Sequence, residues 1–598
     1  MEGLEITVLL GLTILAGTML APRVRLALPL VLVVFGLLLG FVPELREVQL
    51  PPETVLLLFL PVMLFWESLT TSLRSIRRDF RYILPMSTLL VVASAFAVAG
   101  VAALFGMPWE IALILGAAVA PPDATAVAAL GRLLPRRAFM KLKAESLTND
   151  GTALVLYAIA VSLAVGGQVT PLSVTWTVFV SYVGGIAAGV VVAGLAWLLL
   201  RRVRTTVTIN VTLLLVPFTA FLAAEMIHAS GVLAVVVAGL IAAYLNPQIS
   251  TAASRRQAEA VWPFGVFLLN GALFVLIGLE VQWVVHETSW GEIGRLVLIT
   301  IAVWVALLIV RFLFQLLSAP FQAMGAPRAS HPRGLRTRAQ IVSTVAGMRG
   351  AVSLAIALSV PLTADDGTAL AGRSEIVFVT AGVILLSLLV QAPLLPAVVR
   401  WAGFPVDHVE DEEFELAERA ISGVAMSALD ALAAEHGISD EVRDRIRRDG
   451  YEALELANAR AMARERALID EEVGAMEVLL DAPDPLAVER ESDADVTDPG
   501  IPTVSADPVD DGSSASKERG DGSVLQMVAT SAEVDVMQRS PLIRHDEYSR
   551  LKLVLLDHKR DVLLALRRSG TVDDLVVRRI STRLDLEQVR LQGIEEVD

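Results

Sequence analysis

The stretch 144-AESLTNDGTALVLYAIAV-161 raises the main structural question of this sequence. Asn149, Asp150 and Gly151 together are a common turn signal, yet they stand directly before a long apolar run. If they formed a loop, the following helix would run only from about Thr152 to Val165, shorter than the roughly 20 residues that cross a bilayer. We therefore predict a single helix that begins near Ala144 and carries these polar side chains into a membrane.

The composition favours a membrane location for most of the chain. The 598 residues are 55% hydrophobic, with a mean hydropathy of +0.62, which is typical of a polytopic membrane protein. There is no cysteine, which excludes disulfides, thiol catalysis and cysteine-based metal sites. Residues 401–598 hold 45 of the 64 acidic and 23 of the 49 basic side chains, a net charge of −22, whereas residues 1–400 carry +7. The chain therefore divides into an apolar part and an acidic tail.

Thirteen apolar segments are candidates for transmembrane helices. They cover residues 4–21, 26–41, 54–69, 82–105, 109–130, 142–165, 172–200, 207–228, 230–245, 262–283, 292–319, 339–361 and 374–399. Most approach or exceed the length that spans the hydrocarbon, and the second, third and ninth are short. The predicted fold class is an all-α polytopic membrane protein with about 13 transmembrane helices.

The connecting segments alternate in charge. One set holds 20 basic residues, whereas the other holds only Arg46, Arg295 and Arg373. Basic loops stay in the cytoplasm, so the N-terminus is predicted outside and the C-terminal tail in the cytoplasm.

Several ionisable side chains fall well inside the spans, where a charge is costly and is a functional candidate by default. Residues four apart share a helix face, so Ser146 and Asp150 form one pair on the sixth span, and Glu145 and Asn149 form the adjacent pair. The ionisable residues inside spans are Glu67, Asp123, Glu145, Asp150, Arg311 and Arg349.

The fifth span, 116-GAAVAPPDATAVAAL-130, is predicted to be interrupted. Pro121 and Pro122 remove two backbone donors and clash with the preceding turn. Freed backbone groups are tolerated in a membrane only where they line a polar cavity, and Asp123 stands where it can cap the half-helix that follows. The alternative is a kinked helix with a structural cap.

The twelfth span, 340-QIVSTVAGMRGAVSLAIAL-358, carries Arg349 between Gly347 and Gly350, which also permits a broken helix. A buried guanidinium needs a carboxylate or free carbonyls, and Glu145 is the partner that we predict. The alternative is that Arg349 only neutralises the dipole ends at the break. Interruptions seven spans apart fit an inverted repeat, in which two broken helices cross at the midplane of a transporter.

Five ordered segments resemble the monovalent cation:proton antiporter superfamily, and within it the bacterial sodium/proton exchangers that carry an Asn-Asp signature. The resemblance covers about 400 residues, and LFLPVMLF (58–65) and Arg311 follow the same pattern. The five segments are APPDATAVAAL (120–130), AESLTNDGTALVL (144–156), ASGVLAVVVAGL (229–240), FGVFLLNGALFVLIGLEV (264–281) and GMRGAVSLAIAL (347–358).

The resemblance implies a transmembrane antiporter domain over residues 1–402 in a multi-pass protein of the bacterial inner membrane. Core helices, about 82–165 and 292–399, would move against dimer-forming helices, about 4–69 and 207–283, in a homodimer. It implies a transporter of a monovalent cation and protons in the lipid bilayer, with no enzyme activity, no cofactor and no nucleic-acid partner.

The same resemblance implies roles for site residues. Asp150 would bind the cation and the proton, with Asn149 beside it, Ser146 as an ion ligand and Asp123 as the acid of the unwound helix. Glu145 and Arg349 would form a structural ion pair. The family often has Thr directly before the acid of the fifth span, whereas this chain has Pro122, which offers only its carbonyl.

The chemistry favours competition at one carboxylate. Asp150 can hold a proton or a hard cation, because such cations prefer oxygen ligands, and the Ser146 hydroxyl and freed carbonyls near Pro121 and Pro122 would complete the shell. We expect exchange of Na+ for H+, with one carboxylate favouring a 1:1 electroneutral ratio and a role in pH and cation homeostasis. Exchange of K+ or Li+ and a cation channel remain alternatives. An intramembrane aspartyl protease is disfavoured, because the Gly-x-Gly-Asp type of signature is missing.

The tail, residues 403–598, is predicted to be a helical cytoplasmic regulatory region, with mere solvation as the alternative. Helical patterns run to about Leu480 with a break at Gly437, and they return at 546–570 and 572–591 as a hairpin that turns at Ser569-Gly570. Residues 483–524 are rich in Pro, Asp, Ser and Gly, which indicates a flexible linker.

Overall fold

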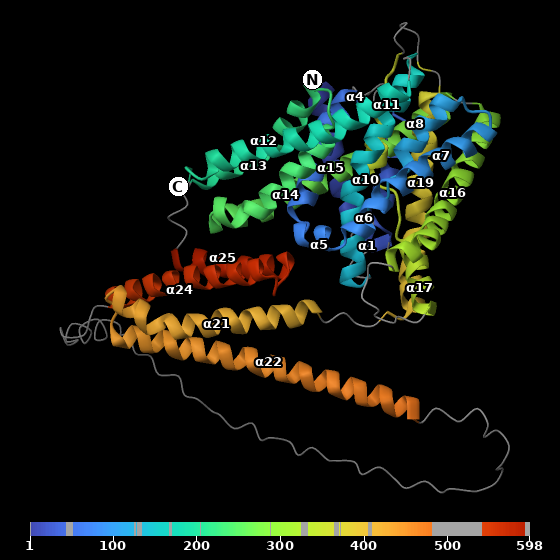
Figure 1. Cartoon of the computed structure of the whole chain (residues 1–598). Coiled ribbons are helices and arrows are strands. Elements are labelled where there is room, and N and C mark those ends of the chain that lie inside the picture. The colour runs from blue at the N-terminus through green and yellow to red at the C-terminus, as the bar shows by residue number, and fades with distance from the viewer. Residues whose placement is uncertain are drawn as a thin grey trace, which may run out of the picture. The chain divides into compact units, whose positions relative to one another are not determined.

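The computed structural model is built from helices (Figure 1). It describes the chain except for residues 1, 25, 43–51, 125–126, 128–133, 167–169, 204, 288, 324–332, 364–369, 371, 405–408, 481–540 and 593–598. The described chain forms two compact units, one of residues 1–414 with 564–598 and the other of residues 415–563. Residues 564–598 therefore group with the apolar helices, which the sequence did not predict. The predicted linker at 483–524 lies outside the described residues.

The helices in the apolar part of the first unit occur in the same order along the chain as the predicted spans. It contains α1 (Glu2–Val24), α2 (Leu28–Leu39), α4 (Pro52–Leu69), α5 (Leu73–Arg78), α6 (Phe80–Ser87), α7 (Leu89–Leu104), α8 (Trp109–Val119), α10 (Arg136–Ala164), α11 (Pro171–Phe179), η1 (Val180–Gly184), α12 (Gly185–Leu200), α13 (Thr206–Glu225), α14 (Gly231–Ile249), α15 (Ala252–Glu287), α16 (Trp290–Ala323), α17 (Arg333–Val345), α18 (Ala351–Leu358), α19 (Arg373–Leu386), η2 (Ser387–Gln391) and α20 (Ala392–Ala402).

The helices confirm the all-α membrane fold. Among the described residues, eight helices are long and apolar enough to cross a membrane, and four shorter apolar helices match the second, third, fifth and ninth predicted segments. The twelfth segment is divided between α17 and α18. Each predicted segment thus coincides with helical structure, and the total of thirteen crossings stays a prediction.

The stretch 144–161 lies inside one helix, α10 (Arg136–Ala164). α10 runs without interruption through Asn149, Asp150 and Gly151, as predicted, and it begins at Arg136, earlier than the expected start near Ala144. The polar side chains are therefore held on a rigid helix rather than on a loop.

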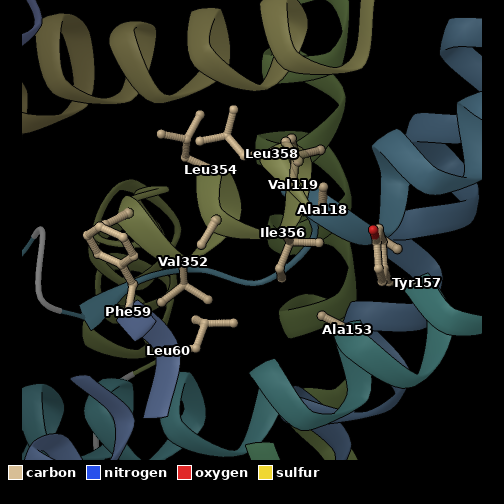
Figure 2. Close-up of a cluster of buried hydrophobic side chains, with 14 of the residues drawn as sticks. Phe59, Leu60, Ala118, Val119, Ala153, Tyr157, Val352, Leu354, Ile356 and Leu358 are labelled. Carbon is tan, nitrogen blue, oxygen red and sulfur yellow. The ribbon is translucent and has the colours of Figure 1, made fainter. Parts of the chain in front are cut away.

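An apolar cluster of side chains packs around α18. Val352, Leu354, Ile356 and Leu358 of α18 lie among side chains of three other helices (Figure 2). These neighbours are Phe59 and Leu60 of α4, Ala118 and Val119 of α8, and Ala153 and Tyr157 of α10. Close packing of this kind limits how the two helix ends beside it can move.

The second unit is a small helical assembly. It is formed by most of α21 (Val409–Glu435), by α22 (Asp440–Leu480) and by most of α24 (Pro541–Ser569). Gly437, with a φ of 62°, breaks the chain between α21 and α22 as predicted. The unit has a core of its own, which includes Leu429 and Leu555. After α24 the chain turns at Gly570 into α25 (Asp574–Gln592), which belongs to the first unit.

Candidate functional site

The first break lies where the consecutive prolines predict it. α8 ends at Val119, and the chain leaves the helix at Ala120 and Pro121. A proline has no backbone N–H, so the next free donors are those of Asp123 and Ala124. The Asp123 N–H donates to the carbonyl oxygen of Met348 at 2.7 Å, and the Ala124 N–H donates to the Ser146 hydroxyl at 3.2 Å.

The second break meets the first. α17 ends at Val345 and α18 begins at Ala351, which confirms an interruption on both sides of Arg349. A Cβ on Gly350 would lie 1.8 Å from Oδ2 of Asp123, so only glycine leaves room for that carboxylate. The two interrupted helices are therefore in direct contact at their breaks.

Arg349 satisfies the carbonyls that the breaks release. Its guanidinium donates to the carbonyl oxygens of Val119 at 3.0 Å, Ala120 at 3.2 Å and Gly347 at 2.5 Å. Without these bonds, buried carbonyls at the ends of two helices would be unpaired. The role that the sequence left as an alternative for Arg349, neutralising dipole ends, is the one observed.

The predicted ion pair between Glu145 and Arg349 is wrong. Glu145 pairs instead with Arg311 of α16, whose two Nη atoms donate to the two carboxylate oxygens at 2.6 and 3.1 Å. The Arg311 Nε also donates to the Ser343 carbonyl at 3.0 Å. A planar guanidinium binds a carboxylate best through two parallel bonds, and here both partners are buried. Arg311 was recognisable in the sequence as an ionisable residue in a span, but nothing there selected its partner.

Ser146, Asn149 and Asp150 lie together on the face of α10 that meets the first break. All three are buried, at 2%, 0% and 3% exposure. The Asn149 amide donates to the carbonyl oxygen of Pro122 at 3.3 Å, and its own oxygen accepts no hydrogen bond from the described residues. Ser146 accepts from the backbone beside Asp123. The structure therefore brings the predicted site residues of α10 to Pro122 and Asp123.

The Asp150 side chain is buried and makes no hydrogen bond within the described part of the chain. The charged groups that act on it are two further carboxylates, Glu67 and Asp123. Burying three acids close together is unfavourable unless protons or cations neutralise them. The arrangement is thus suited to binding a small cation or a proton.

Glu67 is the residue that the predicted site omitted. It lies on α4, is buried, and its Oε1 has no hydrogen-bond partner among the described residues. The sequence marked it as an ionisable residue in a span, but a position on an interface was an equally good interpretation. Only the packing of α4 against the broken helices places it near Asp150.

Two broken helices that meet at buried carboxylates inside a bundle of apolar helices form the arrangement that secondary transporters use for ion binding. The family model described as sodium/hydrogen exchanger, transmembrane, matches residues 10–401. The chain belongs to this family of cation/proton exchangers.

Individual relatives agree with this assignment. An uncharacterized Na+/H+ exchanger of Mycobacterium tuberculosis is 35% identical over 593 residues, covering 98% of this chain and 96% of that protein. A Bacillus subtilis antiporter, named for sodium, potassium, lithium and rubidium against protons, is 31% identical and covers 65% of this chain and 61% of its own. The solved sodium proton antiporter of Methanocaldococcus jannaschii shares the fold, with a TM-score of 0.51, 17% identity, and coverage of 68% of this chain and all of that one.

Proposed function

We propose that the chain exchanges Na+ for H+ across the bacterial inner membrane by alternating access, with Asp150 as the shared binding group. The observation that carries the proposal is the burial of the Asp150 side chain, which makes no hydrogen bond to the described residues, is acted on by the carboxylates of Asp123 and Glu67, and stands next to Asn149, which binds the first helix break. The Ser146 hydroxyl and the Pro122 carbonyl supply the neutral oxygen ligands that a hard cation prefers. Asn149 holds the Pro122 carbonyl in position.

Coupling follows from competition at one carboxylate. A proton and a cation on Asp150 exclude each other, so each crosses only when the other has left. The core, about 82–165 and 292–399, moves past the dimer-forming helices, about 4–69 and 207–283, only when Asp150 is neutralised, because an unpaired charge is costly to carry through the bilayer. With the charges of Glu67 and Asp123 unchanged through the cycle, one carboxylate that alternates between one proton and one monovalent cation makes the exchange electroneutral.

The test uses proteoliposomes with purified protein. Na+, K+ and Li+ gradients are applied in turn, and proton movement is followed with an internal pH dye. Na+ is expected to drive the fastest proton movement, and the rate is expected to be the same at clamped potentials of either sign. Faster proton movement with K+ than with Na+ would identify K+ as the preferred substrate. Currents that scale with the membrane potential would indicate a channel or an electrogenic exchanger.

Asp150→Asn is the decisive variant, and it is expected to abolish exchange. The matched control is Glu110→Gln, which removes an exposed carboxylate at the start of α8. Exchange at the wild-type rate in Asp150→Asn removes this residue from the central role.

A further inference from the structure

The last helix is anchored on the apolar helices of its own unit. Asp585 of α25 accepts two hydrogen bonds from Arg255 of α15, at 2.7 and 2.6 Å, and Asp585 is buried. At the start of α25, Asp574 accepts from the Ser72 hydroxyl at 2.9 Å. Bonds at these two points fix the orientation of the helix, so the side chains between Asp574 and Asp585 have defined positions.

Arg578 lies between these anchors and contacts the end of α4. Its Nη1 donates to the carbonyl oxygen of Leu69 at 3.1 Å, and its guanidinium lies over the Trp66 ring, 5.9 Å from the centroid. Lys143 of α10 binds the next residue, donating to the carbonyl and hydroxyl oxygens of Thr70 at 3.2 and 2.6 Å. Two cations therefore bind consecutive carbonyls at the end of one helix, where the partial charge is negative.

These two cations are linked electrostatically to the ion site. Arg578 acts on Lys143, Lys143 and Glu67 act on each other, and Glu67 acts on Asp150. Glu67 belongs to the same helix end, one turn before Thr70. A helix from the C-terminal region thus places a guanidinium beside Lys143, and the carboxylate of Glu259 on α15 also acts on that guanidinium.

Two neighbouring positive charges repel each other, and they also repel an arriving cation. The guanidinium supplied by α25 therefore adds a second positive charge at a helix end that Lys143 already binds. The Arg578 guanidinium lies on the same end of α4 as Lys143, which joins α4 to the helix that carries Asp150.

We propose that Arg578, with Lys143, forms an electrostatic barrier on the cytoplasmic approach to Asp150, so that docking of α25 lowers the apparent affinity for the transported cation. This proposal rests on the exchange function proposed above. Arg578 acts through its charge and does not itself bind the transported cation. Release of α25 would raise the apparent affinity for that cation.

The experiment compares two neighbouring arginines. Arg578→Gln and Arg579→Gln remove the same charge from the same helix, but Arg579 lies over the Phe414 ring at 4.5 Å and pairs with Glu410 and Asp411 at 3.6 Å. In everted vesicles, Arg578→Gln is expected to lower the apparent KM for Na+ by about 3- to 10-fold, the size of a unit-charge interaction at an intermediate dielectric constant, with the maximal rate within about twofold. Arg579→Gln is expected to match the wild type.

Two further measurements separate charge from structure. Arg578→Lys keeps the charge and is expected to keep the wild-type KM, and Arg578→Met gives the same comparison as Gln if the Gln variant does not accumulate. Raising the ionic strength with an impermeant salt is expected to shrink the difference between Arg578→Gln and the wild type, because salt screens charges near water.

Three outcomes overturn the proposal. They are a KM in Arg578→Gln equal to that in Arg579→Gln, a raised KM, and a changed maximal rate with an unchanged KM, which indicates a purely mechanical clamp. Failure of the proposed function looks different, because the wild-type protein itself then shows no cation-driven proton movement.

Discussion

Glu145 and Arg311 show how strongly the interior of this protein constrains its charges. Both side chains are almost fully buried, and their paired bonds leave neither charge without a partner. Arg349 has no carboxylate bound to it in the described chain and instead donates to backbone carbonyl oxygens. The two arginines therefore have different tasks, and their variants are expected to behave differently.

Removing one partner of the buried pair is expected to be expensive. Glu145→Gln leaves the Arg311 guanidinium without an anion, which costs about 3–5 kcal/mol for a buried pair. The measurement is the thermal stability of the purified protein in detergent. The control is Glu375→Gln, because the pair between Glu375 and Arg295, at 2.7 Å, is partly exposed and such pairs contribute about 0–1 kcal/mol. Equal stability losses in the two variants contradict the assignment.

Gly350 provides a second test at this scale. Gly350→Ala places a methyl group against the Asp123 carboxylate, which must then move, and overpacking of this kind costs about 1–3 kcal/mol. We expect exchange to fall at least about tenfold while the protein still inserts into the membrane. Gly265→Ala is the control, because a Cβ at Gly265 meets no atom within 4 Å. Normal exchange in Gly350→Ala means that the position of Asp123 is not critical.

Among the elements of the protein, long helices stand beside two helices that are interrupted. Two consecutive prolines end α8, and glycines flank Arg349 between α17 and α18. Each interruption is local in the sequence, yet each is stabilised by groups from the other, through the bond from Asp123 to Met348 and those from Arg349 to Val119 and Ala120. The breaks therefore form one structural unit.

The docking of α25 has a defined pH dependence through Asp574. Burial by itself would raise the pKa of Asp574, but hydrogen bonds from Arg567, at 2.7 Å, and Ser72 hold the pKa below its ordinary value. A lowered pKa stabilises docking above the ordinary pKa of about 3.9, and this stabilisation is lost as the pH falls through the lowered value. Docking is therefore expected to be insensitive to this group between about pH 5 and 8.

Hydrogen exchange of the α25 amides provides the measurement. Asp574→Asn is expected to increase their exchange by the same factor at pH 6 and pH 8, after correction for the intrinsic rate. A factor that differs between these two pH values means that a group other than Asp574 controls docking in this range.

For the molecule as a whole, the arginine-rich connections between helices predict an orientation in the membrane. The proposed topology has the N-terminus outside and α25 with the second unit in the cytoplasm. The natural absence of cysteine makes this simple to test, since every introduced thiol is the only one in the chain.

Single-cysteine labelling is expected to report opposite sides for two exposed positions. Trp290→Cys, at the start of α16, is expected to react with an impermeant maleimide in intact cells, because it follows a connection with few basic residues. Tyr451→Cys, on α22 in the second unit, is expected to react only after permeabilisation. The reverse labelling pattern would show that the protein has the opposite orientation in the membrane.

The class of fold, the location of the apolar helices, both interruptions and the place of Asp150 inside a helix could all be predicted from the sequence. These features depend on local properties, namely the length of apolar runs, the missing N–H of proline and the small size of glycine. The helix over residues 144–161 could be predicted for the same reason, since a loop at Asn149 and Asp150 would leave a helix too short to cross the membrane.

The pairing of the buried charges depends on the packing of the helices. Glu145 had two arginines available, and its partner Arg311 is 166 positions away. No local signal in the sequence predicts that Glu67 lies near Asp150. None predicts that α25 belongs to the same unit as the apolar helices. The physical reason is that a buried charge selects its partner by distance and desolvation in the packed protein, and these are set by helix packing rather than by residue type.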